Sequence, residues 1–282
     1  MDVAARTVLG ADPALEAQLR GLASRRLVFF AGLPGTGKSL LVHQLAHLAA
    51  GAGRAVHLLQ WDVARPVFEA SPAGQRYPLN DGVTHPVIRK AAGLWVREAL
   101  VAWDARHAGP DHVLIGETPF VGGRFIEVAR PAEDRAEALL TSASCRFVIA
   151  VPSRDVRRFV EAERARRAAD PRHPREREDA PPRVLRDVWR ELARVAGRPG
   201  DDEYDPVVYR RVYETILRPR HVEIVSLDVI LPIGGLSVYD FAAELPTLVP
   251  TEAEAGAFVA SVEHRYPDRA ALDREIDGWW QG

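Results

Sequence analysis

Short apolar runs and longer amphipathic stretches alternate along this chain. Five runs of five to seven mostly apolar residues are typical of strands buried in a parallel sheet: residues 26–31, 55–60, 112–116, 146–151 and 221–227. Between these runs, apolar residues recur every three or four positions, as they do on the buried face of a helix. Strands that alternate with helices favour a sheet covered on both faces. We therefore predict an α/β fold with a five-stranded, mainly parallel sheet.

The helical periodicity covers residues 11–24, 40–48, 86–100, 131–143, 153–169, 183–196 and 206–218. Two stretches lack it. Residues 63–84 are rich in proline, glycine and other turn residues, which predicts a loop. Residues 171–182 hold four prolines among many charges, which predicts a mobile or disordered insertion.

The domain organisation follows from these elements. We predict one domain over residues 1–250, with a helical insertion at about 153–200. A helical extension is predicted over residues 251–282, because a Thr-x-x-Glu capping box opens it and a short helix follows Pro267. We interpret this extension as a packing element or as the contact of a homodimer.

Composition narrows the class of protein. The 282 residues carry a net charge of −2, so the chain as a whole has no electrostatic attraction to nucleic acid or an anionic membrane. Cys145 is the only cysteine, which excludes a disulfide framework, and the nine histidines show no metal-ligand spacing. No window is long and apolar enough to span a membrane, and the first residues do not read as a signal peptide. We expect a cytoplasmic protein with no nucleic-acid or membrane partner.

The segment after the first apolar run fits the phosphate-binding pattern G-x-x-x-x-G-K-[ST] at every fixed position. Its residues are Gly32, Leu33, Pro34, Gly35, Thr36, Gly37, Lys38 and Ser39, and Leu40 continues into the helix. Glycines let backbone N–H groups turn around an anion, and the helix N-terminus adds positive charge. Lys38 would reach the β- and γ-phosphates of a nucleotide, and the Ser39 hydroxyl would bind Mg²⁺.

The use of basic residues strengthens this interpretation. Of the 37 basic residues only Lys38 and Lys90 are lysines, so a lysine at this position stands out in a chain that otherwise uses arginine. Strand, loop and helix also follow in the order that the motif requires. The sequence therefore predicts nucleotide binding at residues 32–40.

Two acids follow the predicted strands. Ligands of parallel sheets bind at the carboxyl ends of the strands, where Asp62 and Glu117 are expected. The guanine-reading motif N-K-x-D is absent, since Asn80 is the only asparagine, which argues against a GTPase of the usual sort. Glu117 stands alone, without the second acid that polarises water in motor-like ATPases. This favours transfer of phosphate to a bound acceptor.

Together these residues resemble the small-molecule and nucleotide kinases of the phosphate-loop superfamily, a group that includes nucleoside monophosphate kinases, chloramphenicol phosphotransferase and zeta-toxin-like kinases. The resemblance covers about residues 24–230 and rests on Gly32 to Ser39, Asp62, Glu117 and the arginine-rich segment after the fourth strand. It implies the three-layer fold of P-loop NTPases with a helical lid. It also implies ATP and Mg²⁺ as cofactors.

The resemblance implies roles for single residues. Asp62 would be the general base or the anchor of the acceptor hydroxyl, and Arg65 repeats the D-x-x-R spacing of zeta-toxin-like kinases. Glu117 would hold Mg²⁺ with Ser39, although most families have Asp there, so it could instead contact the acceptor or act as the base. Arg124 follows two glycines and could approach an anionic acceptor.

Arginines of a closing lid would stabilise the charge of the transferred phosphoryl group. Thirteen arginines lie between Arg154 and Arg194, and Arg158 is our candidate among them, while Arg164 and Arg167 could face one site. The leading hypothesis is an ATP- and Mg²⁺-dependent kinase of a small molecule such as a nucleoside, nucleotide or sugar derivative. A regulatory ATP-binding switch that acts on a protein partner and a polynucleotide kinase remain as alternatives.

Overall fold

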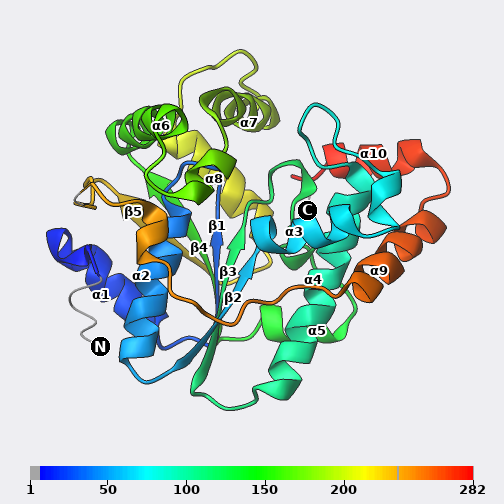
Figure 1. The fold of residues 1–282 in the computed structure, drawn as a ribbon, viewed down its shortest axis with the longest axis horizontal. Coiled ribbons are helices and arrows are strands. Elements are labelled where there is room, and N and C mark those ends of the chain that lie inside the picture. The colour runs from blue at the N-terminus through cyan, green and yellow to red at the C-terminus, as the bar shows by residue number, and fades with distance from the viewer. Residues whose placement is uncertain (1–6, 234, 282) are drawn as a thin grey trace.

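A five-stranded, all-parallel sheet forms the centre of the molecule (Figure 1). The computed structural model describes residues 7–233 and 235–281. The strands are β1 (Leu27–Ala31), β2 (Ala55–Gln60), β3 (His112–Thr118), β4 (Cys145–Pro152) and β5 (Val222–Leu227). Their order across the sheet is β2-β3-β1-β4-β5, so the first strand lies in the middle. The predicted α/β class, strand number and parallel direction are confirmed.

Helices cover both faces of the sheet, as the apolar pattern predicted. The helices of the described residues are α1 (Pro13–Leu22), α2 (Lys38–Gly51), α3 (Trp61–Ala70), α4 (Pro86–Arg106), α5 (Arg135–Leu140), α6 (Arg154–Ala169), α7 (Pro182–Val195), α8 (Pro206–Ile216), α9 (Glu252–Arg265) and α10 (Arg269–Asp277). Successive side chains of a strand point to opposite faces, so Phe29 enters one hydrophobic core and Phe30 the other. In Figure 1, α1 and α2 lie left of the sheet and α4 and α5 lie right of it.

Two of the predicted irregular stretches are structured. Residues 61–70 form α3, although residues 63–84 were predicted as a loop, because Trp61, Ala64 and Phe68 bury one apolar face in spite of Pro66. The predicted insertion at 171–182 contains a short 3₁₀ helix, Pro174–Glu178. Glu176 is buried there and pairs with Arg167 at 3.0 Å, so this segment is tied to α6.

The predicted helix at 131–143 is shorter than expected. Only Arg135–Leu140 is helical, because the Asp134 side chain accepts hydrogen bonds from the backbone N–H groups of Ala136 and Glu137 and caps the helix there. The carboxylate of Asp134 also receives two hydrogen bonds from Arg97 of α4, each at 2.6 Å. A single side chain thus sets where α5 begins and joins it to α4.

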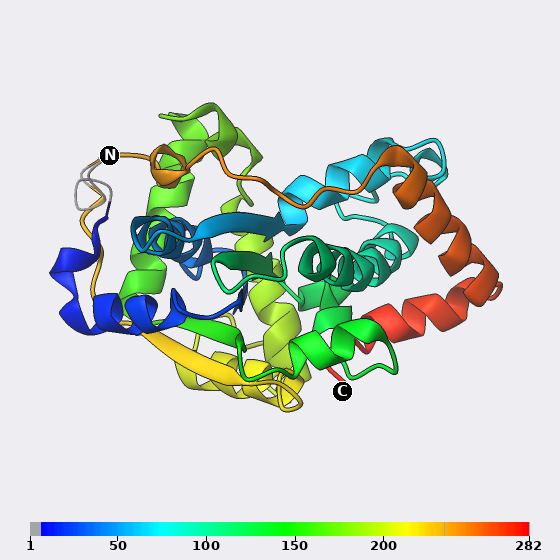
Figure 2. The same ribbon diagram turned by 90° about the horizontal axis from the view of Figure 1, so that it is seen from below.

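The C-terminal helices pack on the same core as α4. The predicted capping box is present, since Thr251 and Glu254 bond reciprocally at the start of α9. Val259 and Trp279 are buried in the hydrophobic core that α4 and the sheet share. Figure 2 shows α9 and α10 beside α4, at the end of the molecule away from α1. The extension is therefore a packing element within this chain.

A long segment connects β5 to this extension and crosses the edge of the sheet. It makes backbone hydrogen bonds with β2, from Leu58 N–H to the Pro246 carbonyl and from Leu248 N–H to the Leu58 carbonyl, each at 2.8 Å. In Figure 1 it runs across the front of the molecule in orange. Within the described ranges, none of the helices combines the length and apolar character that crossing a bilayer would require.

Candidate functional site

The glycine-rich loop (residues 32–37) joins β1 to α2 at the carboxyl end of the central strand. Gly35 and Gly37 have φ angles of +79° and +85°, a region that residues with a Cβ rarely adopt, and Gly37 is the N-cap of α2. The loop is closed internally, because the Leu33 carbonyl accepts hydrogen bonds from the Thr36 hydroxyl and from Lys38 Nζ, each at 2.9 Å. The loop therefore wraps around its own lysine.

Four side chains form a cluster at this edge of the sheet: Lys38, Ser39, Asp62 and Glu117. We call it the Lys38–Asp62 cluster. Lys38 Nζ lies 3.5 Å from Glu117 Oε1, and the Ser39 hydroxyl lies 3.3 Å from Glu117 Oε2. Glu117 is the second-last residue of β3 and lies beside Phe30 of β1, which is why it reaches the loop after β1. The sequence prediction that these residues meet is consistent with this geometry.

The charges of the cluster act on one another. Burial lowers the pKa of Lys38, the nearby Glu117 carboxylate opposes that decrease, and the charge of Arg164 adds to it. The pKa of Asp62 is raised, first because the surrounding protein displaces water and then because of the negative charge of Glu117. The Asp62 side chain keeps a solvent-exposed surface in the first turn of α3, so water screens part of this effect. Asp62 is thus a carboxylate of increased basicity at an open site.

Arg65 and Arg124 lie near Asp62. Arg65 follows Asp62 by one helical turn on α3 and approaches Glu69 at 3.4 Å. Arg124 lies in the tight turn after β3 and donates a hydrogen bond to the Val121 carbonyl at 2.7 Å. The charges of both arginines oppose the rise in the pKa of Asp62. Both residues named from the sequence are therefore near the cluster.

On α6, Arg157 contacts the glycine-rich loop, and the predicted candidate Arg158 does not. The Arg158 side chain is 64% exposed and pairs with Glu203 at 2.6 Å, away from the loop. Its neighbour Arg157 is 1% exposed and donates a hydrogen bond to the Pro34 carbonyl at 2.6 Å. Seven positions further on, Arg164 reaches Lys38 electrostatically. Since seven residues make two turns of a helix, Arg157 and Arg164 share the face that meets the loop.

Tyr209 of α8 is a further contact of the loop that sequence reasoning missed. Its hydroxyl packs so close to Gly32 that a Cβ there would lie 2.1 Å from it. The ring is fully buried, and burial raises the pKa of its hydroxyl. No local signal in the sequence marks this tyrosine. Helix α8 begins 169 positions after the loop ends, and only the folding of the chain brings Tyr209 to Gly32.

Three histidines come together at the opposite end of the sheet. His57 of β2, His107 after α4 and His112 of β3 place ring nitrogens within 4.8 Å of one another, a grouping that the spacing along the sequence did not indicate. Yet the ring centroids of His57 and His107 are 4.3 Å apart, closer than the roughly 5 Å of imidazoles around a tetrahedral ion. Burial lowers the pKa of His57 to about 4. At neutral pH the His57 ring is therefore uncharged.

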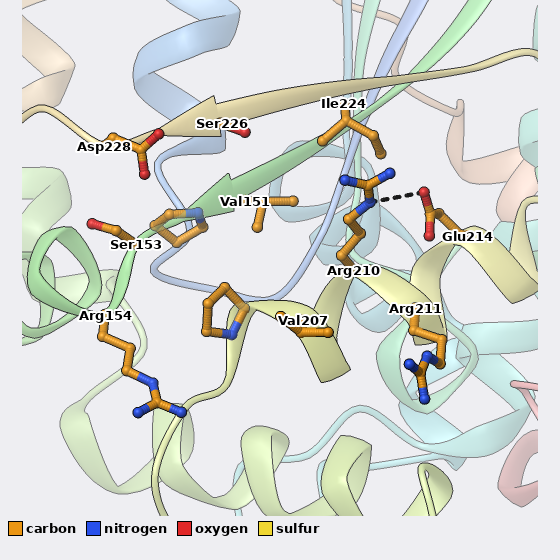
Figure 3. Close-up of a pocket in the computed structure, with 12 residues that line it drawn as sticks. Val151, Ser153, Arg154, Val207, Arg210, Arg211, Glu214, Ile224, Ser226 and Asp228 are labelled. Carbon is orange, nitrogen blue, oxygen red and sulfur yellow. Dashed lines mark hydrogen bonds and ion pairs between the residues drawn. The ribbon is translucent and has the colours of Figure 1, made fainter.

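A cavity of about 440 Å³ lies between β4, β5 and α8 (Figure 3). Figure 3 shows Arg210 and Glu214 hydrogen-bonded at one side of it, 2.9 Å apart. Asp228 and Ser153 line its other side, and none of the residues predicted for the site lines it. The cavity is separate from the Lys38–Asp62 cluster.

Comparisons of this chain with protein-family models, with curated proteins and with solved structures gave no match.

Proposed function

We propose that this protein transfers the γ-phosphoryl group of ATP to a small-molecule acceptor. The observation that carries the proposal is the Lys38–Asp62 cluster beside a loop of the phosphate-binding pattern. Lys38 offers a buried point charge and Glu117 lies 3.5 Å from it. Asp62 lies close enough to both charges to feel them, and its exposure would let an acceptor reach it. A cation, two acids and a glycine-rich loop at one sheet edge are the parts that phosphoryl transfer requires.

The oxygen atoms of Ser39 and Glu117 fit a magnesium ion. The hydroxyl and the carboxylate lie 3.3 Å apart, near the roughly 2.9 Å between neighbouring ligands of an octahedral Mg²⁺. Both are hard oxygen donors, the kind that Mg²⁺ prefers. When bound, the ion would neutralise charge on the β- and γ-phosphates.

The protein's own residues have separable tasks. The backbone N–H groups of the loop and Lys38 bind the phosphates, and the loop is held in shape by Arg157 and Tyr209. Arg164 lies on the α6 face over the loop, where its charge would stabilise the moving phosphoryl group. These tasks keep the donor in place while the acceptor approaches.

Asp62 is the proposed base. The acceptor hydroxyl oxygen forms a bond to the γ-phosphorus as the bond from that phosphorus to the β–γ bridging oxygen breaks. The hydroxyl proton passes to Asp62 and ADP leaves. The raised pKa of Asp62 makes its carboxylate a better proton acceptor than an ordinary aspartate.

The test is incubation of γ-labelled ATP with pooled metabolites, comparing the wild type with Lys38→Ala and Asp62→Asn. Lys38→Ala should lose the labelled product, and Asp62→Asn should keep ATP binding while transfer falls at least about 100-fold. Glu98→Gln, an exposed carboxylate of α4, is the matched control and should retain full activity. Absence of any labelled product from the wild type, or equal turnover of Asp62→Asn, would contradict the proposal.

A further inference from the structure

Three arginines from three separate elements lie near Asp62: Arg65 of α3 and Arg124 after β3 act on its charge, and Arg89 of α4 lies beside Arg124. We call them the arginine pocket. Gly122 lies between two of them, because a Cβ at this glycine would be 3.0 Å from Nη1 of both Arg89 and Arg124. Arg89 Nη1 also donates a hydrogen bond to the Gly122 carbonyl at 2.6 Å. The guanidinium groups of Arg89 and Arg124 thus meet at one turn of the chain.

Arg89 and Arg124 have no acid within salt-bridge distance among the described residues. Among the side chains that the structure describes, no carboxylate oxygen lies within 4.0 Å of the guanidinium nitrogens of Arg89 or Arg124, and Arg65 reaches only Glu69. The Nε atoms of Arg65 and Arg89 are buried without a hydrogen-bond partner. More distant acids act on both: Glu191 on Arg89 and Arg124, Asp273 and Asp277 on Arg89, and Asp62 on Arg124. The Oε1 atom of Glu191 already accepts the indole N–H of Trp279 at 2.7 Å.

Arg97, eight residues after Arg89 on α4, shows how the same helix holds a structural arginine. It is buried, yet it donates two hydrogen bonds to Asp134 and one to Glu137, at 2.6 to 2.9 Å. In contrast, burial and the charge of Arg124 lower the pKa of Arg89 to about 10. Arg89 and Arg124 are half-buried, and a partly desolvated cation with no counter-ion in contact is unfavourable, so these two arginines are suited to bind an anion from outside the chain.

The turn that carries Arg124 has an unfavourable backbone conformation at two residues. Phe120 and Phe125 flank it with φ angles of +61° and +59°, and both rings are fully buried. Bulky residues seldom adopt this region, and such strain persists where the surrounding structure enforces it, often at ligand sites. Gly122 itself has a φ of +65°, and any Cβ there would press on both guanidinium groups. The turn is thus built to bring Arg124 against Arg89.

From this geometry we propose that the acceptor is a phosphorylated small molecule, whose phosphate the arginine pocket of Arg65, Arg89 and Arg124 binds beside Asp62. This inference rests on the proposed phosphotransfer, since it names the acceptor of that site. Two of the three arginines have no carboxylate partner within salt-bridge distance, which matches the charge of nearly −2 on a phosphate monoester. Guanidinium groups also bind phosphate oxygens bidentately, which fixes the position of the acceptor hydroxyl relative to Asp62.

The first experiment measures binding without turnover. Calorimetric titration of inorganic phosphate uses Lys38→Ala protein, because this change removes the cation of the glycine-rich loop and weakens that competing anion site. Arg89→Gln and Arg124→Gln in this background should weaken phosphate binding at least tenfold, and Arg89→Lys should recover part of it. Arg106→Gln, an exposed arginine at the end of α4, is the matched control and should bind as before.

The second experiment separates this inference from the proposed function. In the transfer assay, phosphorylated acceptors should be labelled in preference to their unphosphorylated forms, and Arg89→Gln should raise the KM for the acceptor at least tenfold with the KM for ATP unchanged. Transfer to neutral acceptors that is insensitive to Arg89→Gln would refute the inference and leave the kinase proposal standing. Phosphate binding that depends on Arg89, without transfer by the wild type, would support the pocket and refute the kinase. No phosphate binding, or tighter binding of succinate than of phosphate, would overturn the choice of ligand.

Discussion

Replacement of Arg157 by alanine should destabilise the protein far more than replacement of its neighbour Arg158. The Arg157 side chain is 1% exposed, while that of Arg158 is 64% exposed. Arg157 donates to the Pro34 carbonyl and to Glu161, each at 2.6 Å, and its guanidinium lies 5.4 Å from the centre of the Tyr204 ring. It therefore joins α6 to the glycine-rich loop.

The magnitude follows from these contacts. A hydrogen bond from a charged donor contributes about 1.5–3 kcal/mol, and a largely desolvated cation–π contact about 0.5–2 kcal/mol. Because Arg157→Ala removes both and leaves the Pro34 carbonyl without this donor, we expect a loss of about 2–4 kcal/mol. Arg158 has only exposed ion pairs, with Asp155 and Glu203, so Arg158→Ala should cost less than about 1 kcal/mol.

Urea unfolding followed by tryptophan fluorescence measures both variants under the same conditions. The midpoint should fall clearly for Arg157→Ala and hardly for Arg158→Ala, with the denaturant slope unchanged. Arg157→Lys should lie between the wild type and Arg157→Ala, because an ammonium group keeps the charge but not the fork of donors. Equal destabilisation by the two alanine variants would refute the assignment of Arg157 as the residue that holds the loop.

Three more results are expected. Gly32→Ala should cost about 2–3 kcal/mol in thermal unfolding, since its Cβ would lie 2.1 Å from the Tyr209 hydroxyl, and Tyr209→Phe should restore part of that loss. Glu137→Gln should cost about 3 kcal/mol by calorimetry, because Arg220, whose side chain is 0% exposed, would lose its carboxylate; a loss below 1 kcal/mol would contradict this. Burial lowers the pKa of His43 from 6.5 to about 4, so only the unfolded chain binds the proton as the pH falls below 6.5. The contribution of His43 to the free energy of unfolding is therefore fully present above pH 6.5 and should decrease by up to about 3 kcal/mol as the pH falls toward 4. In urea titrations at several pH values, His43→Gln should flatten this pH dependence.

Much of the fold could be predicted because its signals are local. The five strands were found within about three residues of their observed ends, since a buried parallel strand is a continuous apolar run between turn residues. Asp62 and Glu117 were expected at one sheet edge, because the carboxyl ends of parallel strands share that edge. The capping box at Thr251 was found for the same reason, as its four residues are adjacent in the chain.

Errors arose where packing overrides composition. Pro66 and the following turn residues suggested a loop, but the burial of Trp61 and Phe68 against the core outweighs the hydrogen bond that a proline removes from α3. Arg157 could not be distinguished from Arg158, because both lie in the same amphipathic turn and only the rotation of α6 about its axis decides which one meets the loop.

The sequence by itself determined the layers, the parallel sheet and the position of the glycine-rich loop, since each depends on the order of apolar and polar residues over a few positions. Only the tertiary structure decided that Arg89 lies against Arg124, that Arg124 lies near Asp62 and that Tyr209 packs on Gly32. These contacts join residues far apart in the chain. They depend on how whole helices pack on the sheet, and no local pattern records that arrangement.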